Sequence, residues 1–116
     1  MRDTLLKARQ HRAMSSIHLI KKSEAGLPQI VPVPGEPNTY TSGFWTLSEE
    51  TAHTLVGGQI YFHDRQRAPA FYGGQIVAAQ RAPDSDKIVF KFVFLPDHRG
   101  VRTGADGWAQ EMKLVL

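Results

Sequence analysis

Two stretches of this chain begin with the same four residues and end with the same four. They are GGQIYFHDRQRAP, which starts at Gly57, and GGQIVAAQRAP, which starts at Gly73. Glycine lets a strand bend sharply, as a small barrel requires, so we expect two consecutive strands that are each entered through a glycine corner. The repeat is too short, and its copies are too differently flanked, to be the period of a solenoid.

The residues around the repeat predict the remaining elements. Ser48 is expected to cap a helix over residues 49–56, and Gly57 to end it in the left-handed conformation. In the strongest predicted strand, residues 87–95, one face carries the core residues Ile88, Phe90, Phe92 and Phe94. Further strands are expected over 16–22, 59–63, 75–81 and 108–116, with a loop over 64–72. We therefore expect an α+β fold, a small and mostly antiparallel open β-barrel with one main α-helix.

The positive charge of the chain is concentrated near its N-terminus. Residues 1–22 hold six basic residues and one acidic residue, whereas the rest of the chain holds eight basic and ten acidic residues. Residues 1–14 favour a short helix, and residues 26–38 carry four prolines, which favour an extended peripheral segment. We expect residues 1–38 to form a basic arm with a proline-rich linker, and residues 39–116 to form one domain. Such an arm suits an anionic partner such as nucleic acid, or serves only as a solubilising tail.

Several classes of protein are not expected from the composition. No apolar run approaches the roughly 18 residues of a membrane helix, and no signal-peptide pattern begins the chain. Cysteine is absent, which excludes disulfides and thiolate metal sites and fits a reducing compartment. We expect a cytoplasmic protein that needs no membrane, no metal and no cofactor.

The central third of the chain resembles a known superfamily. GFWTLSEETAHTLVGGQIYFH and FYGGQIVAAQR, within residues 43–81, are similar to the PUA-like superfamily, especially its EVE- and ASCH-type domains. In those domains a short helix runs into a glycine at the start of a barrel strand, and the next strand carries a glycine-led phrase. The resemblance implies a PUA-like pseudo-barrel that binds RNA or modified DNA bases in an aromatic-walled pocket.

The chemistry of nucleic-acid binding points to six side chains. An aromatic ring stacks on a base, and a guanidinium holds a phosphate through two hydrogen bonds. The candidates are Trp45, Tyr61 and Trp108 for stacking and Arg65, Arg67 and Arg81 for phosphates. The alternatives are that both tryptophans belong to the core and that the arginines form a solvated surface. We expect a module that binds nucleic acid and accommodates an unpaired or modified base.

Two other functions remain open. Pro96-Asp97 followed by Glu111-Met112-Lys113 resembles the PD-(D/E)XK nucleases, in which Asp97 and Glu111 would hold Mg²⁺ and Lys113 would position the attacking water. The proline-rich residues 28–37 could instead order on a protein partner or across a homodimer.

Two His/Asp pairs in the sequence also allow a site with different chemistry. They are His63-Asp64 and Asp97-His98. If the two pairs met in the fold, they could bind a metal or act as acid and base.

Overall fold

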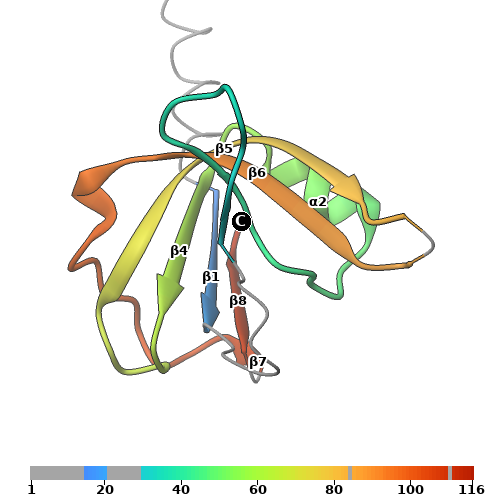
Figure 1. The fold of residues 1–116 in the computed structure, drawn as a ribbon. Helices are drawn as coiled ribbons and strands as arrows, with labels where there is room; N and C mark the ends of the chain where they lie inside the picture. The colour runs from blue at the N-terminus through green and yellow to red at the C-terminus, as the bar shows by residue number, and fades with distance from the viewer. Residues whose placement is uncertain (1–14, 21–29, 84, 110) are drawn as a thin grey trace, which may run out of the picture.

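The computed structural model describes residues 15–20, 30–83, 85–109 and 111–116, in which eight strands form one sheet (Figure 1). The strand order is β2-β3-β6-β5-β4-β1-β8-β7. The strands are β1 (Ser16–Ile20), β2 (Val31–Pro32), β3 (Thr39–Thr41), β4 (Gln59–His63), β5 (Ala70–Arg81), β6 (Ile88–Phe94), β7 (Trp108–Ala109) and β8 (Met112–Val115). β1 and β4 are parallel, and the other neighbours are antiparallel. Because β2 and β7 are not paired with each other, the sheet stays open and is not a true barrel.

The second glycine pair lies inside β5 rather than at its start. β5 begins at Ala70, so the loop predicted over 64–72 is too long. A Cβ on Gly73 would clash with the carbonyl oxygen of Ile60 and lie 3.1 Å from the Cβ of His98. At Gly74 it would lie 2.7 Å from the carbonyl carbon of Val93. The pair is therefore required because the neighbouring backbone approaches β5 closely on both sides.

One α-helix, α2 (Glu49–Leu55), lies within the described residues; its predicted start is confirmed, and it ends one residue earlier than predicted. The Oγ of Ser48 accepts a hydrogen bond from the backbone N–H of Thr51 at 3.1 Å. Gly57 follows the helix with a φ of 92°, in the left-handed region that favours glycine. Ala52 and Leu55 are buried against the sheet, so α2 covers one end of the core.

Replacing Ser48 with alanine is expected to lower the free energy of unfolding by about 1 kcal/mol, because the Thr51 N–H loses its acceptor. Ser48→Asp is the control, since a carboxylate accepts the same bond and favours a helix N-terminus. Urea denaturation followed by circular dichroism measures both variants. Equal stability of Ser48→Ala and the unmodified protein would show that the cap contributes nothing.

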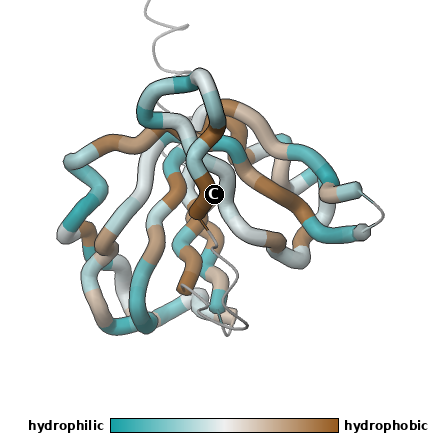
Figure 2. Tube along the Cα trace, in the orientation of Figure 1, coloured by the Kyte–Doolittle hydropathy of each residue, from teal (hydrophilic) through white to brown (hydrophobic). Residues whose placement is uncertain are grey.

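The core lies on the face of the sheet that carries α2. Its largest side chains come from four strands and the helix, and Figure 2 shows hydrophobic residues in the central strands and hydrophilic ones in the outer loops. The fully buried aromatic residues are Phe62, Phe90 and Phe92. The predicted core face of β6 is thus confirmed for Ile88, Phe90 and Phe92, whereas Phe94 is half-buried and stacks on Tyr72 at 4.6 Å.

Three further expectations meet the structure with different results. β1, which we assigned to the N-terminal arm, lies inside the sheet between β4 and β8, so the boundary expected at residue 38 does not separate it from the domain. β2 lies at the sheet edge, as the prolines predicted. The strand predicted over 108–116 is a hairpin of β7 and β8. The helix expected over residues 1–14 lies outside the described residues.

In the part of the chain that the structure describes, none of the helices has the length and apolar character needed to cross a membrane.

Candidate functional site

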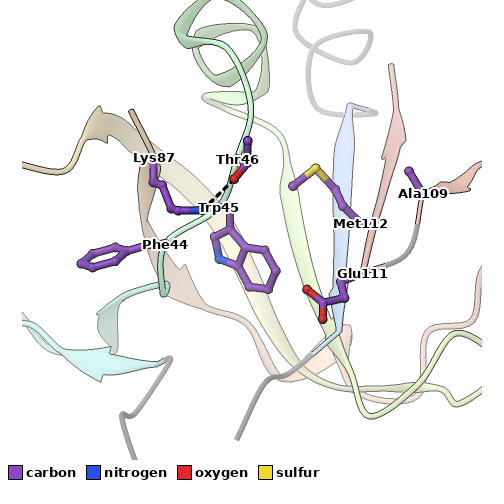
Figure 3. Close-up of a pocket in the computed structure, with 7 residues that line it drawn as sticks. All are labelled: Phe44, Trp45, Thr46, Lys87, Ala109, Glu111 and Met112. Atoms are coloured by element: carbon purple, nitrogen blue, oxygen red, sulfur yellow. Dashed lines mark hydrogen bonds between the residues drawn. The ribbon is translucent and has the colours of Figure 1, made fainter. Parts of the chain in front are cut away.

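A hollow of about 300 Å³ opens between the two arms of the bent sheet (Figure 3). One side is formed by the segment that leads into α2 and by the residue before β6, and the other by the β7–β8 hairpin. The lining residues that carry the argument are Phe44, Trp45, Thr46, Lys87, Glu111 and Met112. The volume is at the lower end of the range for small-molecule sites, which suits one small planar ligand.

Backbone pairing fixes the aromatic side of the hollow. Trp45 exchanges two hydrogen bonds with Ile88, at 3.0 and 2.8 Å, so its segment extends the sheet beside β6. Neighbouring side chains of an extended segment point to opposite sides. The indole of Trp45 is accordingly buried, with 3% exposure, while the ring of Phe44 is 63% exposed. The indole of Trp45 therefore forms the floor of the hollow, while the ring of Phe44 points to the other side of the same segment (Figure 3).

The opposite side is positioned by β1. Ile20 donates its backbone N–H to the carbonyl oxygen of Glu111 at 2.9 Å, and Leu19 pairs with Met112. Figure 3 shows the thioether of Met112 and the carboxylate of Glu111 turned toward the indole of Trp45. A half-buried carboxylate thus faces an aromatic floor.

Lys87 supplies a cation to the same hollow. Its Nζ donates to the Oγ1 of Thr46 at 2.9 Å, which uses one of the three hydrogens of the ammonium. In Figure 3, Lys87 and Glu111 lie on opposite sides of Trp45. The residues that line the hollow therefore include an ammonium, a carboxylate and two aromatic side chains, which are kinds of group found in ligand sites.

A second cluster covers the opposite face of the sheet, where β1 and β4 run in parallel. The ring of Tyr61 is stacked between His18 and His98, with centroids 4.6 and 4.5 Å away. His63 approaches His18 from the end of β4, and Trp108 of β7 lies edge-on to both imidazoles. His98 belongs to the short 3₁₀ helix η2 (Pro96–His98), which lies over Gly73. The cluster is an aromatic layer that closes this side of the sheet.

Hydrogen bonds assign the protons of the histidine pair. The Nδ1 of His63 lies 2.8 Å from the carbonyl oxygen of Ala68, which only accepts, so this nitrogen carries a hydrogen. In a neutral ring the Nε2 of His63 then accepts, and it lies 2.8 Å from the Nδ1 of His18. With both rings neutral, His18 is therefore the donor in this bond.

Burial holds the histidines in this neutral form. His18, His63 and His98 are 4%, 0% and 7% exposed. Burial, the neighbouring His63 and the ammonium of Lys113 lower the pKa of His18 from 6.5 to about 4. Burial also lowers the pKa of His63 and of His98 and raises the pKa of Tyr61.

The six residues predicted for nucleic-acid binding lie in three places. Tyr61 and Trp108 belong to the histidine layer, and Arg65 and Arg67 lie in the exposed loop after β4. Trp45 and Arg81 lie elsewhere, near the start of β6. The structure therefore does not bring all six side chains to one cleft.

The arginines differ in their surroundings. The guanidinium of Arg81 forms an ion pair with Glu49 of α2, at the far end of β5 from Arg65 and Arg67. Beside Arg67 lies Arg102, which donates to the Arg67 carbonyl oxygen at 3.3 Å. Arg65, Arg67 and Arg102 therefore form an exposed basic strip at the end of β4.

The residues of the alternative nuclease are not assembled. Asp97 lies in η2, which packs on β5, whereas Glu111 and Lys113 lie on the β7–β8 hairpin. The strands β4 and β1 separate these two regions. The Nζ of Lys113 donates to the carbonyl oxygen of Gly104 at 2.8 Å. Across residues 15–20, 30–83, 85–109 and 111–116, no group of three or more His, Cys, Asp or Glu side chains could hold a metal ion.

Sequence reasoning missed the groups that give the hollow its chemistry. Phe44 precedes a tryptophan and Lys87 precedes a strand, and neither position carries a motif. Glu111 was considered only as a magnesium ligand. The second cluster could have been found from the sequence. His18, His63 and Tyr61 occupy the polar positions of strands in which apolar and polar residues alternate.

Comparison with protein families, with curated proteins and with solved structures finds no match for this chain.

Proposed function

We propose that the protein is a nucleic-acid-binding module that takes one unpaired base into the hollow beside Trp45. The observation that carries the proposal is a hollow of about 300 Å³ that has the indole of Trp45 as its floor and the exposed Phe44 among its lining residues. A phenylalanine that is 63% exposed beside a hollow is available for stacking, and stacking on a base contributes roughly 1–3 kcal/mol.

The surface charge supports the same proposal. The chain has a net charge of +3, and the strip of Arg65, Arg67 and Arg102 presents three guanidiniums to solvent. Such groups contact phosphates without reading sequence, so they position a strand while the hollow receives a base. The bent, open sheet also suits the PUA-like pseudo-barrel that residues 43–81 resemble.

Binding to oligonucleotides tests the proposal. We expect a fluorescent single-stranded oligonucleotide to bind more tightly than its duplex, because a paired base must first be extruded. Affinity should fall steeply between about 50 mM and about 200 mM salt. Phe44→Ala should weaken single-strand binding by roughly tenfold, since one stacking ring is lost.

Leu116→Ala is the matched control, because it truncates another exposed apolar side chain outside the hollow. It should bind like the unmodified protein. Failure of every oligonucleotide to bind at low salt would remove the proposed function, and equal binding by Phe44→Ala would remove the hollow from it.

A further inference from the structure

The loop between β4 and β5, residues 64–69, is tied to the histidine layer by a hydrogen bond. His63, the last residue of β4, bonds through its Nδ1 to the carbonyl oxygen of Ala68 at 2.8 Å. From the other side, Arg102 donates to the carbonyl oxygen of Arg67 at 3.3 Å. The loop carries two arginines of the basic strip, so the position of His63 helps to place the strip.

The bond to the loop is the second of two linked bonds. The Nδ1–H of His18 donates to the Nε2 of His63 at 2.8 Å, and the Nδ1–H of His63 donates to the loop. One extra proton on the pair still leaves one of the two facing nitrogens able to accept. With both rings protonated, an N–H group stands on each facing nitrogen, and the bond between the rings is lost. The two positive charges then repel each other, so one ring has to move away.

The strand geometry makes His63 the ring that moves. It ends β4, and the pairing of β4 with β5 shifts register between Phe62 and His63. His18 lies in the middle of β1, which is paired on both sides. The end of a strand beside a β-bulge opens at lower cost than the middle of a paired strand. His63 therefore leaves the layer together with the loop that it holds.

The surroundings disfavour protons on the closed pair. The rings of His18 and His63 are 4% and 0% exposed, and Lys113 of β8 lies opposite His18 in the strand register. Burial, the neighbouring His63 and the ammonium of Lys113 lower the pKa of His18 from 6.5 to about 4. Once the loop has moved, the imidazoles reach water and take up protons near their ordinary pKa. Acid therefore favours the open form.

The other titratable groups of the layer do not hold the loop. Tyr61 of β4 separates the pair from His98 of η2. The Nε2 of His98 lies 2.6 Å from the Oε1 of Gln59, which accepts from a neutral or a charged ring, so a proton on His98 breaks no bond there. β7 contributes Trp108, which does not titrate. The remaining charged groups of η2 and of the loop are Asp97, beside His98, and Asp64, Arg65 and Arg67.

We propose that the His18–His63 pair is a proton-operated latch that holds loop 64–69 while both rings are neutral and releases it in acid. Release moves Arg67 away from Arg102, so the basic strip is assembled in the closed form. The inference goes beyond the proposed function, because the latch acts on the loop whether or not a nucleic acid binds. Through His18 alone, the ratio of open to closed loop rises roughly 50-fold between pH 7 and pH 4.5.

NMR relaxation of the backbone amides at a series of pH values between 7 and 4 tests the latch without any ligand. We expect the order parameters of residues 64–69 to fall from about 0.85 to below about 0.6, while those of β6 stay near 0.85. In the same samples, the imidazole nitrogen shifts of His63 should change from the neutral to the charged form. Their midpoint should coincide with that of the loop.

His18→Asn removes the titrating ring and keeps the latch bond. The side-chain amide of asparagine lies where the Nδ1 of histidine lies, and it presents a donor or an acceptor to the Nε2 of His63 as required. The loop of this variant should therefore stay ordered down to pH 4.5. His53→Asn, on the exposed side of α2, is the matched control and should release the loop like the unmodified protein.

A loop whose order does not change with pH would overturn the latch, and so would an equal release in His18→Asn. Loss of order in β6 at the same pH as in the loop would also overturn it, because the whole domain then unfolds. If His18→Asn does not fold, the unmodified protein decides the question. Coinciding midpoints of His63 and the loop support the latch, and different midpoints overturn it. Since no oligonucleotide is present, nucleic-acid binding is tested separately.

Discussion

Replacing Gly74 with alanine is expected to lower the free energy of unfolding by about 3 kcal/mol. The new Cβ would lie 2.7 Å from the carbonyl carbon of Val93 and 3.0 Å from the Cα of Phe94, and would also clash with the Val93 carbonyl oxygen. All three are backbone atoms of β6, so no side-chain rotation relieves the contact. Urea denaturation followed by circular dichroism measures the loss.

Gly104→Ala is the control for this substitution. A Cβ on Gly104 would meet only the Nζ of Lys113, at 3.9 Å, and the φ of this residue is not in the left-handed region. Its stability should therefore stay within a few tenths of a kcal/mol of the unmodified protein. If Gly74→Ala were as stable as Gly104→Ala, the close approach of β6 to β5 would not be what requires glycine.

The second large effect is a loss of stability in mild acid. The folded-state pKa of His18 is lowered from 6.5 to about 4, so the unfolded chain binds a proton that the folded chain does not. The contribution of His18 is fully present above pH 6.5 and is lost as the pH falls toward 4. By pH 4 this group alone lowers the free energy of unfolding by about 3 kcal/mol. His63 and His98, whose pKa values are also lowered, act in the same direction.

Urea denaturation at a series of pH values between 7 and 4 measures this dependence. His18→Gln should flatten the profile, since the residue that must stay neutral is gone. His53→Gln, which removes an exposed histidine of α2, should keep the profile of the unmodified protein. A profile for His18→Gln that falls as steeply as that of the unmodified protein would contradict the assignment of the neutral pair.

Local signals in the sequence predicted the elements that depend on local contacts. Ser48 predicted the start of α2 because its side chain bonds a backbone group only three residues away. Alternation predicted the buried face of β6, since each strand residue points away from the previous one. Phe94 departs from the pattern because it stacks on Tyr72, a contact that periodicity does not contain.

Contacts between distant residues could not be read in this way. The parallel pairing of β1 with β4 joins residues such as Ile17 and Ile60. Neither strand carries a sequence pattern that indicates which strand it pairs with. The glycine pair at 73–74 signalled a bend, but only the positions of Val93 and His98 show why it falls inside a strand.

The candidate site illustrates the same limit. Trp45 was a candidate for stacking, with burial in the core as the alternative, and the structure places its indole at 3% exposure as the floor of a hollow. The free ring belongs to its neighbour Phe44. Glu111 comes from the other end of the sheet, and only the open gap between the two arms brings it opposite Trp45 (Figure 3).

The claim that a base occupies this hollow is tested most directly by the fluorescence of Trp45. The chain has two tryptophans, so Trp108→Phe leaves Trp45 as the only indole. We expect single-stranded oligonucleotide to quench its emission with the same midpoint as binding measured by anisotropy, because the base stacks within contact of the indole. Binding without any change in Trp45 emission would contradict the claim.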